Sequence, residues 1–122
     1  DWTNLLTVVP IAPIAWLMGV PWSEATTVGS LLGIKTVLNE FIAYIKLQEM
    51  PVDMLSEHSK LIALYAVCGF ANLSSVGIQI SGIGAMCPER RPDLISLGFR
   101  ALLAATLASC MCGAIVGIVT RF

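Results

Sequence analysis

A long run without a charged residue lies between Lys60 and Glu89, and a polar stretch interrupts its middle. About 20 apolar residues are enough for a helix to cross a bilayer, so this run is long enough for a membrane span. Its middle, however, contains Asn72 and two serines and is flanked by Gly69 and Gly77. Because glycine tolerates a non-helical backbone, this stretch predicts a break in the helix. Backbone groups freed at membrane depth must then be packed against protein or line a cavity.

Three polar residues of this stretch, Asn72, Ser75 and Gln79, are spaced i, i+3, i+7 and would share one face of a continuing helix. Such a face can exchange hydrogen bonds with a polar solute. It can equally bond to a neighbouring helix, where each bond contributes about 0.6 kcal/mol. The stretch alone leaves both interpretations open.

The composition also places the chain in a membrane. Of its 122 residues, 57% are hydrophobic and 12% are charged, and the mean hydropathy is +0.83. These values are too apolar for an ordinary soluble domain. The net charge of −1 and the lack of a basic patch give no indication of nucleic-acid binding. The sequence shows no signal peptide and starts at Asp1, and we expect it to be part of a longer protein.

The cysteines and the single histidine form no metal-binding pattern. All four cysteines lie in or beside apolar segments: Cys68, Cys87, Cys110 and Cys112. We expect them to be buried small side chains rather than disulfide partners or metal ligands, and we expect no metal site. His58 lies in a polar connection, where we expect it to be solvent-exposed and without a role.

The first segment, residues 4–22, is apolar and is interrupted by Pro10 and Pro13. Prolines kink or end helices, and the tryptophans of this region suit a membrane interface. We therefore predict the end of a membrane helix followed by an interfacial turn. Ser23 and Ser56 are candidate caps for the helices that follow.

The second segment, residues 23–50, has charged residues in the middle of an apolar run. A straight helix here would be about 39 Å long and would leave Lys35 near mid-membrane. A lone charge there costs at least about 2.5–3.5 kcal/mol. We therefore predict a re-entrant hairpin, with helix from about 25 to 35, a turn at 36–40 and helix to about 47. One spanning helix with Lys35 and Glu40 packed against other helices is the alternative.

The remaining chain contains two further membrane elements. Residues 56–87 are the predicted discontinuous helix, and residues 93–120 are the predicted last spanning helix. The charged loop between them contains two arginines, which favour the cytoplasmic side. Small residues on the last helix predict close helix contact: Ala104, Ala105, Ala108, Gly113 and Gly117. The predicted fold class is an all-α membrane protein with a re-entrant helical hairpin, a discontinuous transmembrane helix and a final spanning helix.

Two interrupted elements with polar residues at membrane depth are typical of a secondary transporter's binding site. Here they are the hairpin tip, Asn39 and Glu40, and the break at 72–75. A carboxylate can accept bonds from two hydroxyls, so the set suits an uncharged polyol. A membrane scaffold or assembly subunit whose polar groups only bond helices is the alternative. An enzyme that used Glu40 as an acid or base would also need a second carboxylate, a set of metal ligands or a nucleophile–base pair. The sequence offers none of these beside Glu40, so we expect no enzyme and no catalytic residue.

Two motifs at these positions closely resemble the paired signatures of the concentrative nucleoside transporters. They are NEFIA at 39–43 and GFANLSSVGI at 69–78, and PIAWLMGVP at 13–21 resembles the segment before the family's second re-entrant hairpin. The resemblance covers essentially the whole chain. It implies the carboxyl-terminal part of an ion-coupled (Na⁺ or H⁺) nucleoside symporter, a multi-pass homotrimer in the inner or plasma membrane of the cell.

The resemblance also implies roles for single residues. Glu40 would bind ribose hydroxyls from the hairpin, Asn72 and Ser75 would hold the ribose from the broken helix, and Phe70 would contact the nucleoside. Asn39 matches the motif and is expected to shape the tip. In the family, base recognition and the coupling-ion site belong to a first hairpin and a first broken helix, which are not in this sequence. The expected partners are a nucleoside, a coupling cation and the lipid bilayer, with no cofactor and no nucleic acid polymer.

Overall fold

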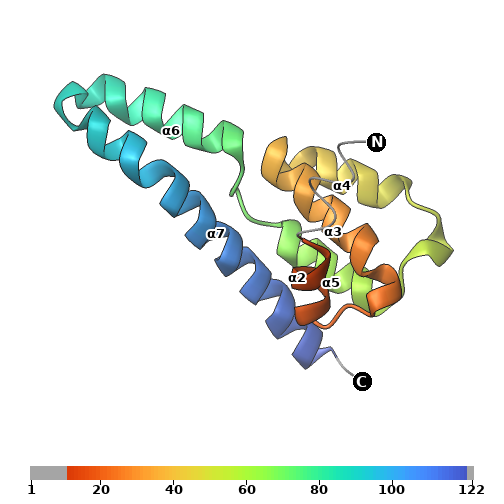
Figure 1. Ribbon diagram of the computed structural model, residues 1–122. Coiled ribbons are helices and arrows are strands. Elements are labelled where there is room, and N and C mark those ends of the chain that lie inside the picture. The colour runs from red at the N-terminus through yellow and green to blue at the C-terminus, as the bar shows by residue number, and fades with distance from the viewer. Residues whose placement is uncertain (1–10, 121–122) are drawn as a thin grey trace.

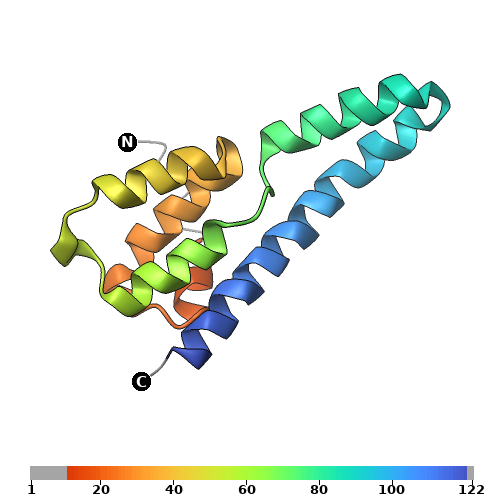
Figure 2. The same ribbon diagram turned by 180° about the vertical axis from the view of Figure 1, so that it is seen from behind.

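The computed structural model describes residues 11–120, and every regular element in that part of the chain is a helix (Figure 1). Helices α2 to α5 form a compact part. Helices α6 and α7 run side by side and extend away from it as a long arm, which is clearest from behind (Figure 2). The all-α fold class is thus confirmed for the described residues. The predicted segment at 4–10 lies outside them.

The chain enters the compact part through a short helix, α2 (Ala12–Leu17), and a tight turn. Gly19 has a φ of 103°, a backbone conformation that glycine adopts without strain. The rings of Trp16 and Trp22 meet edge to face at 6.3 Å and are largely exposed, as suits an interfacial position. Pro21, and not Ser23, precedes the first turn of the next helix, so the predicted Ser23 cap is wrong. Proline already has a backbone suited to the chain entering a helix.

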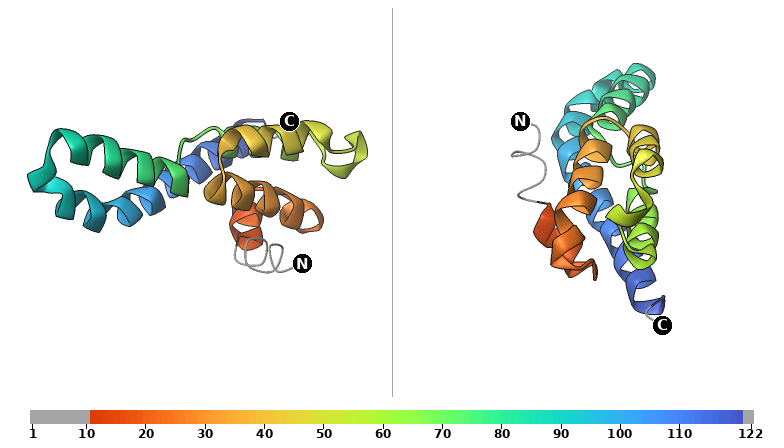
Figure 3. Two further views of the ribbon diagram at one scale, coloured as in Figure 1. Left: turned by 90° about the horizontal axis from the view of Figure 1, so that it is seen from above. Right: turned by 90° about the vertical axis from the view of Figure 1, so that its right-hand side faces the viewer.

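The predicted hairpin segment, residues 23–50, forms most of two helices, α3 (Trp22–Val37) and α4 (Glu40–Glu49), which pack side by side (Figure 3). The break at Leu38 and Asn39 falls within the predicted turn, so the alternative of one unbroken helix is wrong. Asn39 caps α4, because its Oδ1 accepts a hydrogen bond from the Ile42 amide at 3.0 Å.

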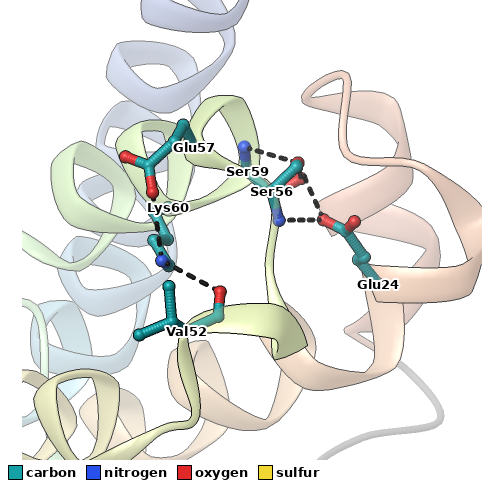
Figure 4. Close-up of polar contacts among 6 residues, drawn as sticks. All are labelled: Glu24, Val52, Ser56, Glu57, Ser59 and Lys60. Carbon is teal, nitrogen blue, oxygen red and sulfur yellow. Dashed lines mark hydrogen bonds and ion pairs between the residues drawn. The ribbon is translucent and has the colours of Figure 1, made fainter.

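A surface connection with a short 3₁₀ turn, η1 (Val52–Met54), leads to α5 (Glu57–Val67). Ser56 caps α5 as predicted, with its Oγ accepting from the Ser59 amide at 3.3 Å. The Glu24 carboxylate accepts from the amide and the hydroxyl of Ser56 at 3.2 and 3.0 Å (Figure 4). Burial raises the pKa of Glu24, but hydrogen bonds from Ser59 and Ser56 outweigh this and leave the pKa below its usual value. These bonds fasten the open end of the hairpin to the start of α5.

The arm consists of α6 (Leu73–Met86), a 3₁₀ turn η2 (Pro88–Arg90) and α7 (Arg91–Val119). Within residues 11–120, only the stretch Pro88–Val119 is long and apolar enough for a membrane span. Its carboxyl-terminal half packs on the compact part. A Cβ at Gly113 would lie 2.9 Å from the Cβ of Ala66, and one at Gly117 would lie 2.7 Å from the Met18 carbonyl oxygen. The predicted close contact is thus confirmed at these two glycines, whereas the three alanines of the set are exposed in this chain.

The predicted exposure of His58 is wrong, and the predicted burial of the cysteines is correct for Cys110 alone. His58 is half-buried, and its Nε2 lies 3.0 Å from the Gly117 carbonyl oxygen, because α7 crosses the first turn of α5. Of the four cysteines only Cys110 is buried, where α7 packs on the compact part. Cys68 lies at the break, Cys87 at the tip of the arm and Cys112 on an exposed face of α7, so all three are exposed in this chain.

Candidate functional site

The predicted break in the long uncharged run lies between α5 and α6, at residues 68–72. Asn72 ends it as the N-cap of α6, with its Oδ1 accepting from the Ser75 amide at 2.7 Å. In return the Ser75 hydroxyl lies 3.3 Å from the Asn72 amide, which completes a capping box. Gly77 lies inside α6. The break therefore occupies only the first part of the stretch between Gly69 and Gly77, and the second part is helical. The local hydrogen bonds of Asn72 and Ser75 restart the helix there.

The hairpin tip contacts this break directly. The side-chain amide of Asn72 donates a hydrogen bond from Nδ2 to Glu40 Oε2 at 3.2 Å. Glu40 is the first residue of α4, a position that the helix dipole favours for a carboxylate. The Asn39 cap fixes the start of α4 and therefore the place of Glu40. Two predicted site residues, 32 positions apart in the sequence, are thus joined side chain to side chain.

The other two predicted site residues lie next to this pair. The Ser75 Oγ is 2.7 Å from the carbonyl oxygen of Phe70 and 2.8 Å from that of Asn72, and its one proton can be donated to only one of them at a time. Asn72 is 4% exposed, whereas the Phe70 side chain is 78% exposed. The carboxylate and the amide therefore meet at the break, and the Ser75 hydroxyl and the exposed Phe70 ring belong to the same short stretch of chain.

A groove of about 740 Å³ between α6 and α7 begins at this ring. Phe70 and Ser75 line one end of it, and Gln79 lines it one turn further along α6. The rest of the lining is almost wholly apolar, and neither Glu40 nor Asn72 takes part. The groove by itself therefore offers few groups that could recognise a hydroxyl-rich solute.

Sequence reasoning treated Lys35 as an energetic cost and missed its contact with the break. The Lys35 side chain is 1% exposed, and its Nζ donates to the Ala66 carbonyl oxygen at 3.2 Å. An ionisable residue within a membrane segment is a functional candidate by default, and this signal was present in the sequence. The sequence could not predict the hydrogen-bond acceptor of Lys35, because this acceptor is a backbone carbonyl at the end of α5.

An all-helical membrane chain in which a hairpin tip meets the break of a discontinuous helix has an arrangement typical of secondary transporters. The chain belongs to the family described as "Na+ dependent nucleoside transporter C-terminus", whose sequence model matches residues 3–117. This confirms the predicted family, whose curated members named below are transporters or permeases and not enzymes.

Curated relatives carry matching names. The chain is 42% identical over 109 residues to the putative nucleoside permease NupX of Escherichia coli, covering 88% of the chain and 26% of that protein. It is 37% identical over 122 residues to the sodium/nucleoside cotransporter 1 of Mus musculus, covering 88% of the chain and 19% of that protein. The chain thus spans about a quarter or less of the length of these relatives.

A solved structure gives the same result for the fold. The structure of CNTnw in an inward-facing substrate-bound state matches with a TM-score of 0.86 and 40% sequence identity. The match covers 96% of this chain and 29% of that one. At this identity the likeness extends to the sequence as well as to the path of the backbone.

Proposed function

We propose that this chain supplies the ribose-binding half of the site in an ion-coupled nucleoside symporter. The observation that carries the proposal is the hydrogen bond between Asn72 and Glu40, which places the hairpin tip on the broken helix. The names of the relatives, which include nucleoside permeases and a sodium/nucleoside cotransporter, support the substrate class and, of the two proposed coupling cations Na⁺ and H⁺, support Na⁺.

The hydrogen-bonding capacity of the pair fits a ribose. A carboxylate has about four lone-pair positions, and the bond from Asn72 uses one of them on Glu40. The remaining positions can accept from two neighbouring hydroxyls of a sugar. Asn72 keeps a second N–H, and Ser75 can redirect its proton from a backbone carbonyl to the substrate. Phe70, two positions before Asn72, is exposed and would offer its ring to the nucleoside.

The helix lengths support a re-entrant hairpin. At 1.5 Å per residue, α3 is about 24 Å long and α4 about 15 Å, whereas the hydrocarbon core of a bilayer is about 30 Å thick. Neither arm of the hairpin is long enough to cross it, and the same holds for α5 and α6 taken singly. Helix α7, at about 43 Å, is long enough. In this arrangement the hairpin tip and the break meet near mid-membrane, within a multi-pass protein of the cell membrane that forms a homotrimer.

The proposal is tested by reconstituting the full-length transporter that carries this chain into proteoliposomes. We expect saturable uptake of a labelled nucleoside that an inward Na⁺ or H⁺ gradient accelerates. Vesicles that contain only the 122-residue chain are the control and should show no uptake, because the rest of the site and the ion site are absent. A full-length protein that folds but shows no saturable nucleoside uptake under either gradient would favour the scaffold alternative.

A further inference from the structure

Lys35 is a buried cation at the break of a helix, and the proposed ribose site does not use it. Its Nζ donates to the carbonyl oxygen of Ala66 at 3.2 Å. Ala66 is the second-last residue of α5. The last carbonyl groups of a helix have no partner within the helix, so the lysine satisfies one that would otherwise be unpaired at the break.

Burial disfavours the charged form of Lys35, and two features of its surroundings offset part of this cost. The carboxyl-terminal end of a helix carries a partial negative charge of about half an electron. The carboxylate of Glu40 adds a further attraction. The ion pairs found within residues 11–120 join other residues, and each of them is at least partly exposed. The charge of Lys35 therefore offsets the partial negative charge at the end of α5. Within the described residues its hydrogen-bond acceptor is a carbonyl oxygen and not a carboxylate.

The unwound backbone at Gly69 and the Ser109 side chain lie near the ammonium group. A Cβ at Gly69 would lie 3.4 Å from Nζ and would overlap the Ser109 hydroxyl, so the backbone of the break passes directly over both groups. Ser109 is 8% exposed, and its hydroxyl donates to the Ala105 carbonyl oxygen at 3.0 Å, which leaves its lone pairs as acceptors. Unwound backbone carbonyls and the carboxyl-terminal ends of half-helices are the groups with which secondary transporters coordinate a coupling cation.

We propose that the Lys35 ammonium is a built-in cation that occupies the place where the break between α5 and α6 would otherwise bind a monovalent ion. The inference rests on the proposed function in assigning this break to an ion-coupled transporter. It follows that this half of the site needs no ion of its own to hold the break in the form that presents Asn72 to Glu40. Lys35 is thus a positioning residue, and neutralising it should create a new dependence on a dissolved cation.

The test uses three variants of the full-length transporter that carries this chain. Lys35→Met removes the charge and keeps the length, whereas Lys35→Arg keeps the charge. Lys46→Met is the matched control, because Lys46 is exposed on α4 and pairs with Glu49 at the surface. The thermal stability of the nucleoside-free protein and its affinity for nucleoside are measured as NaCl replaces choline chloride at constant ionic strength.

We expect Lys35→Met to lose about ten- to a hundredfold in nucleoside affinity at low Na⁺, as for the loss of one charge-assisted hydrogen bond. High Na⁺ should recover most of this loss, and the Na⁺ dependence of both readouts should be steeper than in the wild type. Lys35→Arg and Lys46→Met should keep the wild-type dependence. A folded Lys35→Met with unchanged Na⁺ dependence would overturn the inference, as would a Lys35→Arg protein that acquires the steeper one.

If Lys35→Met cannot be purified, Lys35→Ala purified in n-butylammonium chloride tests the same inference. Butylammonium is a soluble analogue of the missing lysine side chain. Butylammonium should stabilise this variant and not the wild type, and the absence of such a difference counts against the inference. The stability readout needs neither substrate nor uptake. A wild-type protein without gradient-driven uptake would therefore refute the proposed function. The role of Lys35 would still be decided by the stability measurements.

Discussion

The compact part of the chain and the arm bury their apolar side chains to very different extents. In the compact part Val28, Leu31 and Ile62 are completely buried. In the arm, by contrast, Phe99 and Leu103 of α7 are 67% and 64% exposed. The compact part is therefore held by contacts within the chain. The arm presents apolar surface that needs lipid or another part of the protein to cover it.

The candidate site lies where these two regions meet. Glu40 and Lys35 belong to the hairpin of the compact part, whereas Asn72 and Ser75 begin the arm. Among the described residues no buried side-chain nitrogen or oxygen lacks a hydrogen-bond partner. The comparison teaches that the chain fixes one side of the site through its own packing. The other side begins a helix, α6, that packs on α7 and leaves most of its remaining surface exposed in this chain.

The largest expected effect concerns the core of the compact part. Leu31→Ala should destabilise the 122-residue chain in detergent by about 2–5 kcal/mol, because it leaves a cavity in a packed core. Leu103→Ala on the arm removes the same atoms from an exposed position, and we expect a change below about 0.5 kcal/mol. Denaturant unfolding of the two variants measures the difference. Equal losses would show that the arm is as well packed within the chain as the core.

A smaller effect separates two glycines of the arm. Gly117→Ala places a methyl group against the Met18 carbonyl oxygen and should cost about 1–3 kcal/mol, because the backbone cannot move aside easily. Gly77→Ala meets no atom within 4 Å in this chain and should stabilise α6 by up to about 1 kcal/mol through helix propensity. Opposite signs in the same unfolding assay are the expected result. A stabilising Gly117→Ala would contradict the close packing of α7 on the compact part.

The smallest effect concerns the link between the hairpin and α5. The pKa of Glu24 is lower in the folded chain than its ordinary value of 4.5. The folded state therefore favours the ionised form, so its stabilising contribution is present above pH 4.5 and disappears as the pH falls through the folded pKa. Unfolding of the wild type and of Glu24→Gln is compared at pH 7 and at pH 3. The small advantage of the wild type at pH 7 should be smaller at pH 3, and an advantage that grows towards acid would contradict this sign.

Much of this architecture was accessible from the sequence because its signals are local. Glycine, asparagine and serine in an apolar run predicted the break, and the charges at 35 and 40 predicted the turn of the hairpin. The end of the break was less accessible, because the sequence does not show that Asn72 and Ser75 bond to each other and restart the helix. The contacts of Lys35 and His58 could not be predicted, since both bond to backbone carbonyls that any residue type could provide. The meeting of Glu40 with Asn72 follows from the packing of α4 and α5, to which no local pattern points.

The proposed contact of Glu40 with the hydroxyls of a ribose can be measured through nucleoside binding to the full-length transporter. Glu40→Gln should weaken binding of a ribonucleoside by about 1.5–3 kcal/mol, because a charge-assisted acceptor becomes in part a donor. Ser75→Ala should cost about 1 kcal/mol, the value of a neutral bond, and Ser74→Ala, an exposed neighbour, should cost less.

The same variants are then measured with a 2′,3′-dideoxynucleoside, which lacks the hydroxyls that Glu40 would accept from. The dideoxynucleoside should bind the wild type poorly, and Glu40→Gln should weaken its binding little further. This non-additivity is the result that the account predicts. If Glu40→Gln weakened both ligands equally, Glu40 would act only through its bond to Asn72, and the ribose assignment would be wrong.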